Sequence, residues 1–193
     1  MRTTRLEAFS DAVLAIIITI MVLELREPHT ADLAALRPLF PIFLSYLLSF
    51  VYIGIYWSNH HHLIYATEQV SGTILWANLH LLFWLSLIPF VTGWMGENHF
   101  APVPTAAYGV VLLLAAIAYW ILQHTIIARQ GRESIVRVAV GHDWKGKLSP
   151  LAYAVAIPLA LVRPWLAGIL YVLVAIVWLV PDRRLARVVE SEE

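Results

Sequence analysis

The sequence contains no cysteine and few charged residues. Without cysteine, the chain has no disulfide framework, no thiol nucleophile and no metal site built from thiolates. Charged residues make up 13% of the chain, about half the share that is usual for a soluble domain, whereas 60% of the residues are hydrophobic. This composition argues against a water-soluble single domain and favours a protein that crosses a membrane several times.

The chain also lacks an excess of charge of one sign. Its 13 basic and 13 acidic residues give a net charge of zero, so we expect no nucleic-acid partner. Six spanning helices would use about 120 of the 193 residues and leave about 70 for termini and loops. That remainder is too small for a receptor ectodomain, a kinase or a nucleotide-binding domain. We therefore expect a single six-helix transmembrane domain over residues 1–193, with a short cytoplasmic tail at residues 182–193.

Six apolar stretches are candidates for the membrane helices. The last two are separated only by Arg163, which Pro164 follows, and this fits either a tight turn between two short helices or a single kinked re-entrant pair. The first stretch follows basic residues as in a signal peptide, but Asp11 lies at its start, Glu24 lies at its end and no cleavage signal follows, so we expect a retained helix. The stretches cover Phe9–Leu25, Phe40–Trp57, Ile74–Met95, Pro102–Ile127, Leu148–Val162 and Pro164–Val180.

The distribution of basic residues predicts the orientation. With six spans, both termini lie on one side of the membrane, and that side receives ten of the 13 basic residues, whereas the other receives Arg26, Arg37 and Arg163. Because basic loops stay in the cytoplasm, we expect both termini there.

The composition also indicates the source of the protein. Eleven arginines against two lysines, with abundant alanine, leucine and valine, point to a bacterial source. We therefore expect a multi-pass protein of the bacterial inner membrane.

The first apolar helix carries an ionisable side chain near its start. A charged group at the bilayer centre costs at least about 2.5–3.5 kcal/mol, so Asp11 should face protein or water. One interpretation is that Ser10 and Asp11 cap the helix at the positive end of its dipole. The other is that Asp11 belongs to a buried polar network that holds the helices together near the cytoplasmic face.

The same helix has an aliphatic stripe on a different face. At about 100° per residue, Thr19 lies at the edge of this stripe and Asp11 lies about 140° from Ile16. Periodicity alone favours contact of the stripe with lipid or with other helices of a bundle. The stripe contains Phe9, Ile16, Ile20 and Leu23.

The second helix ends in a polar run with three consecutive histidines. Consecutive helical residues diverge by about 100°, so His60, His61 and His62 cannot bind one metal from a regular helix. The chain has no thiolate and no H-E-x-x-H motif, so we expect no metal site and no cofactor. Trp57 and His61 share a face and would form hydrogen bonds with the polar cluster of the first helix, or else an interfacial belt.

Three segments of the chain resemble one family. The first helix opens with Arg5-x-x-x-Phe9-Ser10-Asp11, which resembles the signature of the transmembrane protein 175 family of potassium channels. The end of the second helix, Trp57-x-Asn59-His60-His61, is similar to that family, as is the run Asn78-Leu79…Ile88-Pro89-Phe90. The resemblance covers the six-span plan and therefore nearly the whole chain, although His62 is a third histidine where two are expected.

The resemblance implies an all-α, potassium-permeable channel that has no carbonyl filter of the T-V-G-Y-G type. A chain with one repeat is similar to the members that assemble as homotetramers in the lipid bilayer, with the first helices lining a path for monovalent cations. By resemblance, Ile16 forms a hydrophobic constriction, Ile20 and Leu23 extend its apolar lining, and Thr19 contributes to selectivity. The resemblance also implies a structural polar network behind the pore, made of Arg5, Phe9, Ser10, Asp11, Trp57, Asn59, His60 and His61.

Three other functions are compatible with parts of the sequence. A secondary transporter or proton-coupled permease would use Asp11 and the His60–His62 cluster as a relay and would show saturable, proton-coupled flux. An intramembrane enzyme needs a convergent nucleophile, base or metal-ligand set, and the sequence offers none, so we expect no enzymatic activity. A purely structural scaffold would show no flux.

Overall fold

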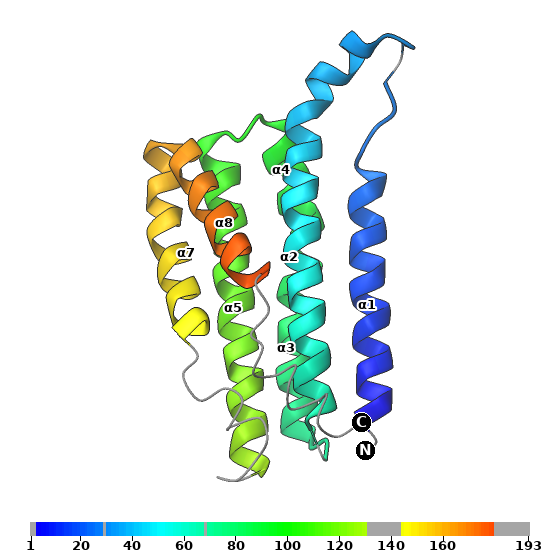
Figure 1. Ribbon diagram of the computed structural model, residues 1–193, viewed down its shortest axis with the longest axis vertical. Helices are drawn as coiled ribbons and strands as arrows, with labels where there is room; N and C mark the ends of the chain where they lie inside the picture. Colours follow the sequence, from blue (N-terminus) through cyan, green and yellow to red (C-terminus); the bar gives the residue numbers. More distant parts are fainter. Residues whose placement is uncertain (1–2, 29, 68, 131–143, 180–193) are drawn as a thin grey trace.

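The computed structural model is an all-helical bundle that describes residues 3–28, 30–67, 69–130 and 144–179 (Figure 1). These residues contain no strand, so the expected all-α fold is confirmed. Most of the polar segment at 129–147 and the expected tail at 182–193 lie outside the described residues. The elements are α1 (Thr3–Leu23), η1 (Leu33–Leu39), α2 (Phe40–Tyr65), α3 (Gly72–Ser86), α4 (Ile88–Glu97), α5 (Pro102–Gln130), α7 (Trp144–Val162) and α8 (Pro164–Leu179).

Successive rods of the bundle run in opposite directions. In Figure 1, α1 rises, α2 descends, α3 and α4 rise in succession, α5 descends, α7 rises and α8 descends. Within the described residues, five helical stretches are long and apolar enough to cross a membrane, and α8 is a shorter apolar helix. The start of α1 therefore lies at the same end of the bundle as the ends of α2 and α5 and the start of α7.

The second helix is longer than its apolar run. The apolar stretch ends at Trp57, but the polar run that we expected at the end of this helix is helical too, and α2 ends at Tyr65. In this polar part of the helix the side chains bond to carbonyls one turn earlier: Asn59 Nδ2 donates to the Ile55 carbonyl at 2.8 Å, and His62 Nδ1 lies 2.6 Å from the Ser58 carbonyl. Hydropathy therefore marks where the apolar face ends and not where the helix ends.

The third apolar stretch is two helices and not one. Leu87 separates α3 from α4, and Pro89 occupies the first turn of α4. Proline has no N–H for the carbonyl one turn earlier and its ring clashes with that carbonyl, which explains the break. The backbone N–H of Val91 then bonds to the Leu87 carbonyl at 3.2 Å, and the helix resumes in the same direction.

The last two apolar stretches form an antiparallel hairpin. α7 ends at Val162 and α8 starts at Pro164, as a tight turn at Arg163 predicts. α7 begins at Trp144, before the predicted Leu148. α8 has 16 residues and is about 24 Å long, which is less than the roughly 30 Å of a hydrocarbon core.

The core on the far side of α2 from α1 is rich in tyrosine. The Tyr52 hydroxyl donates to the Tyr171 carbonyl at 2.6 Å, and the Tyr171 hydroxyl donates to the Thr105 carbonyl at 3.1 Å. The rings of Tyr108 and Tyr171 have centroids 5.5 Å apart. These contacts join α2, α5 and α8, whereas α1 packs on α2, α3 and α4 at the edge of the bundle (Figure 1).

Candidate functional site

α1 buries one face and leaves the opposite face uncovered. Three side chains of the aliphatic stripe are exposed within the chain: Ile16 is 56% exposed, Ile20 43% and Leu23 78%. Uncovered aliphatic side chains in a row mark a face that contacts lipid or another protein surface. The buried side chains of α1 are Leu6, Ser10, Leu14, Ile17 and Met21.

A groove of about 440 Å³ runs beside the stripe, between α1 and the junction of α3 with α4. Ile16 and Ile20 form part of one wall, and Pro89 and Phe90 form part of the other. Glu24 lies at the end of this groove and also lines a second groove of about 280 Å³, which Glu97 lines as well. The walls are therefore aliphatic along α1 and acidic where α1 ends.

Thr19 presents its side-chain oxygen on the exposed side of α1. Its hydroxyl donates a hydrogen bond to the Ile16 carbonyl at 2.8 Å. Because the hydroxyl hydrogen is engaged with the backbone, the oxygen lone pairs are the groups left to face a neighbouring ligand. Thr19 can therefore act as an acceptor toward a cation.

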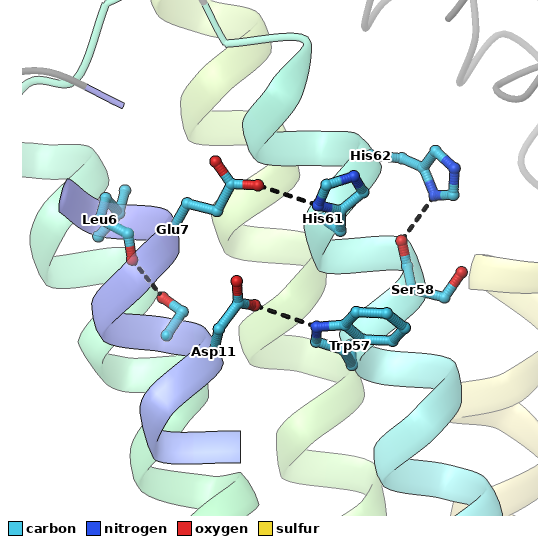
Figure 2. Close-up of polar contacts among 8 residues, drawn as sticks. Leu6, Glu7, Asp11, Trp57, Ser58, His61 and His62 are labelled. Atoms are coloured by element: carbon cyan, nitrogen blue, oxygen red, sulfur yellow. Dashed lines mark hydrogen bonds and ion pairs between the residues drawn. The ribbon is translucent and has the colours of Figure 1, made fainter. Parts of the chain in front are cut away.

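Two polar contacts join α1 to α2 one helical turn apart (Figure 2). Trp57 Nε1 donates to Asp11 Oδ1 at 3.1 Å, and His61 Nδ1 lies 2.9 Å from Glu7 Oε1. Each pair joins residues four apart on one helix to residues four apart on the other, so the helices are held in register. We call these two contacts the α1–α2 ladder. Its groups are partly exposed, so each contact contributes about 1 kcal/mol or less.

A second, fully buried network lies behind the ladder. Asn78 Nδ2 donates to Ser10 Oγ at 3.0 Å, and His60 Nε2 donates to Asn78 Oδ1 at 2.7 Å. Ser10 Oγ donates in turn to the Leu6 carbonyl at 2.9 Å. The network joins α1, α2 and α3, and Asn78 is its central residue.

The structure brings together Ser10, Asp11, Trp57, His60 and His61 of the predicted polar network. Arg5 and Phe9 are exposed and lie outside these contacts. Asn59 and His62 bond to their own helix. The three imidazoles thus have different partners, and the described residues contain no group of three side chains suited to a metal ion.

The sequence reasoning missed Glu7 and Glu24 as candidate site residues. Glu7 lies before the apolar run, but its spacing of one turn from Asp11 matches the spacing of Trp57 and His61. That matched spacing was the available signal. Glu24 has no such partner pattern, and its place beside Gly93 depends on the packing of α4: a Cβ added at Gly93 would lie 3.6 Å from Glu24 Oε2.

Comparison with known proteins gives consistent results. Residues 5–89 match the family model described as "Endosomal/lysosomal potassium channel TMEM175". A potassium channel of Chryseobacterium sp. (strain P1-3) is 51% identical over 183 residues, which cover 95% of each chain. A potassium channel of Streptomyces collinus is 30% identical over 186 residues, which cover 86% of this chain and 90% of that protein.

The fold also matches a solved structure. The crystal structure of a lysosomal potassium-selective channel TMEM175 homologue from Chamaesiphon minutus aligns with a TM-score of 0.81 and 28% sequence identity. The alignment covers 93% of this chain and 97% of that one, so the whole bundle is shared.

Proposed function

The chain belongs to the TMEM175 family of potassium channels, and from this premise we propose that it conducts potassium passively through a path lined by α1. It is a multi-pass membrane channel and not an enzyme. In the proposal, four copies assemble around one axis. Support comes from the uncovered aliphatic face of α1, because one such helix cannot enclose a pore and cyclic symmetry would supply the others.

The proposed constriction is a set of aliphatic rings formed by Ile16, Ile20 and Leu23. The observation that carries this proposal is their exposure of 56%, 43% and 78% on one face of α1. Aliphatic side chains return no hydrogen bonds to water or to the hydration shell of an ion, so a narrow ring of them disfavours water. Such a neck would control conduction by dewetting.

Thr19 is the proposed contributor to selectivity. Its hydroxyl hydrogen bonds to the backbone, so four copies would direct oxygen lone pairs toward the axis. An ion that loses part of its hydration shell in the neck would then find oxygen ligands next to it. The preference for potassium over sodium would depend on the width of the neck and on these oxygens rather than on rings of charged side chains.

The ladder and the buried network are proposed to fix the position of α1. The Asp11–Trp57 and Glu7–His61 contacts hold its start against α2, while Asn78 connects Ser10 to His60. Arg5 and Phe9 are exposed on α1, and in this proposal they contact a neighbouring copy. Both sets of contacts would act on assembly more than on the ion itself.

Purified protein in liposomes tests the proposed function. A potassium gradient is imposed across the membrane, the proton gradient is collapsed with a protonophore, and potassium efflux is followed, with protein-free liposomes as the control. We expect efflux that follows the potassium gradient and needs no coupling ion. Flux that saturates and requires a proton gradient would support the transporter alternative, and no flux would support a scaffold.

The orientation is also part of the proposal, with both termini in the cytoplasm of a bacterial inner membrane. Arg5, Arg129, Lys145 and Lys147 lie at the end of the bundle where α1 begins, and Arg163 lies at the other end. The chain has no cysteine, so single cysteines can be introduced without background. In intact spheroplasts, a membrane-impermeant maleimide should label Arg163→Cys and not Lys147→Cys. The reverse pattern would contradict the orientation.

A further inference from the structure

A cavity of about 40 Å³ lies between α2, α5, α7 and α8, away from α1. Its walls are largely aromatic, with Tyr119, Trp120 and Trp178 among them, and Trp120 is 47% exposed. A water molecule needs about 10–15 Å³ measured in this way, so the cavity has room for a group of three or four non-hydrogen atoms. A larger ligand would extend past Trp120 toward the surface.

Two polar side chains that line the cavity, Gln123 and Tyr56, have no hydrogen-bond partner among the described residues. Gln123 is only 5% exposed, and within the described part of the chain its amide has no hydrogen bond. The same holds for the Tyr56 hydroxyl. Asn59 donates through Nδ2 to the Ile55 carbonyl, which leaves Oδ1 to face other groups. Buried polar groups nearly always form hydrogen bonds. A buried amide that has no partner within the protein therefore indicates that a bound molecule occupies the cavity.

The residues that line the cavity favour a neutral ligand over a charged one. No acidic or basic side chain lines the cavity among the described residues. A charged group would therefore find no counter-charge among these lining residues, and burying a charge that has no partner is strongly unfavourable. A primary amide such as Gln123 has a donor nitrogen and an acceptor oxygen on the same carbon, and a second carboxamide can pair with it, its N–H opposite the oxygen and its C=O opposite the N–H.

We propose that this cavity binds the neutral carboxamide-type head group of a small ligand. Gln123 Nε2 donates to the ligand carbonyl, Gln123 Oε1 accepts from the ligand N–H, and the Tyr56 hydroxyl donates to the same carbonyl. The remainder of the ligand packs against Trp120 at the opening, where an aromatic or aliphatic body buries apolar surface. Tyr56 and Asn59 flank Trp57 on α2, so the site lies on the opposite side of α2 from the α1–α2 ladder.

Direct binding tests the proposal without any measurement of ion flux. The full chain in lipid nanodiscs is equilibrated with radiolabelled benzamide, and with benzoate as the charged analogue of the same shape. We expect saturable benzamide binding whose affinity Gln123→Leu lowers about tenfold or more. The unchanged protein should bind benzoate at least about tenfold more weakly than benzamide. Ala116→Phe, which fills the cavity, should abolish benzamide binding. Ala128→Leu, an exposed position on the same helix, should leave it unchanged.

Several results would overturn the proposal. These are uptake no greater than in protein-free nanodiscs, equal affinity for benzamide and benzoate, or unchanged binding in Gln123→Leu. Thermal unfolding of Gln123→Leu adds a second readout, because an unpartnered amide should be replaceable without loss of stability. A clearly lower unfolding temperature would show that the amide is already bonded within the fold and would contradict the proposal. Should Ala116→Phe not fold, Tyr56→Phe must weaken binding about threefold or more, or the proposal fails.

Discussion

Replacing Asn78 with leucine should destabilise the bundle more than any loss of packing explains. Leucine has the same number and branching of side-chain non-hydrogen atoms, although it is larger, and it removes the donor to Ser10 Oγ and the acceptor for His60 Nε2, which lie at 3.0 and 2.7 Å. Asn78 and Ser10 are 0% exposed and His60 is 1% exposed, so water cannot replace the lost partners. Within the described residues His60 Nδ1 has no partner, so the imidazole would lose its remaining hydrogen bond.

Two sets of typical energies bound the loss of stability that we expect for Asn78→Leu. Groups left unsatisfied in soluble proteins cost about 1–3 kcal/mol each, whereas hydrogen bonds between membrane helices average about 0.6 kcal/mol and reach about 1.7. Because this chain is a bundle of membrane helices, the values for membrane helices apply. The loss of two hydrogen bonds should therefore lower the free energy of unfolding by about 1–3 kcal/mol. At about 2–4 °C per kcal/mol for a chain of this size, the unfolding temperature should fall by roughly 2–12 °C.

Thermal unfolding in detergent, followed by size-exclusion chromatography with tryptophan fluorescence, measures this change. Asn98→Leu is the matched control, because Asn98 is exposed and its side chain bonds only to the Trp94 carbonyl of the adjoining helix, so the change should alter stability by about 0.5 kcal/mol or less. The Asn78→Leu/Ser10→Ala double variant should lose less than the sum of the single variants, because they share a bond. Equal effects of Asn78→Leu and Asn98→Leu would refute the buried network as a source of stability.

Three further changes test other parts of the account. Gly109→Ala should lower stability by about 1–3 kcal/mol in thermal unfolding, because its Cβ would lie 3.0 Å from Tyr171 Cζ and closer still to Tyr171 Oη, whereas Gly168→Ala, with open space around it, should not. Thr19→Val should reduce the potassium preference in bi-ionic reversal potentials without a matching gain in current; an unchanged preference would remove Thr19 from selectivity. Asp11→Ala should reduce the yield of the proposed tetramer in native mass measurement, since Trp57 Nε1 loses its acceptor. Normal assembly with altered cation preference would instead place Asp11 in the ion path.

Much of the fold follows from composition and hydropathy. The starts of α2, α5 and α8 and the turn at Arg163 agree with the apolar stretches. The apolar stretch ends at Trp57 and α2 ends at Tyr65, because hydropathy detects apolar faces and not helix ends; the polar run with the three histidines was expected to be helical, and it is. The break at Leu87 was missed although Pro89 is visible in the sequence, because a proline in the first turn of a new helix and a proline kink have the same pattern.

The candidate site was only partly predictable, for a related reason. Helical angles separate the Ile16 stripe from Asp11, so the two faces of α1 follow from the sequence. The partners of Asp11 and Ser10 lie 46 and 68 residues away along the chain, and no periodicity links them. Glu7 was overlooked because it precedes the apolar run, even though it pairs with His61 as Asp11 pairs with Trp57.

The central claim is that the uncovered face of α1 lines the path of the ion. Single-channel conductance and bi-ionic reversal potential of Ile16→Asn test it most directly, with Phe83→Asn as the control, because Phe83 is a 54% exposed apolar residue on α3. A polar neck admits water and a hydrated ion, so Ile16→Asn should raise conductance and weaken the discrimination between potassium and sodium, while Phe83→Asn changes neither. If Ile16→Asn leaves both quantities unchanged and Phe83→Asn alters them, α1 does not line the path and the account is wrong.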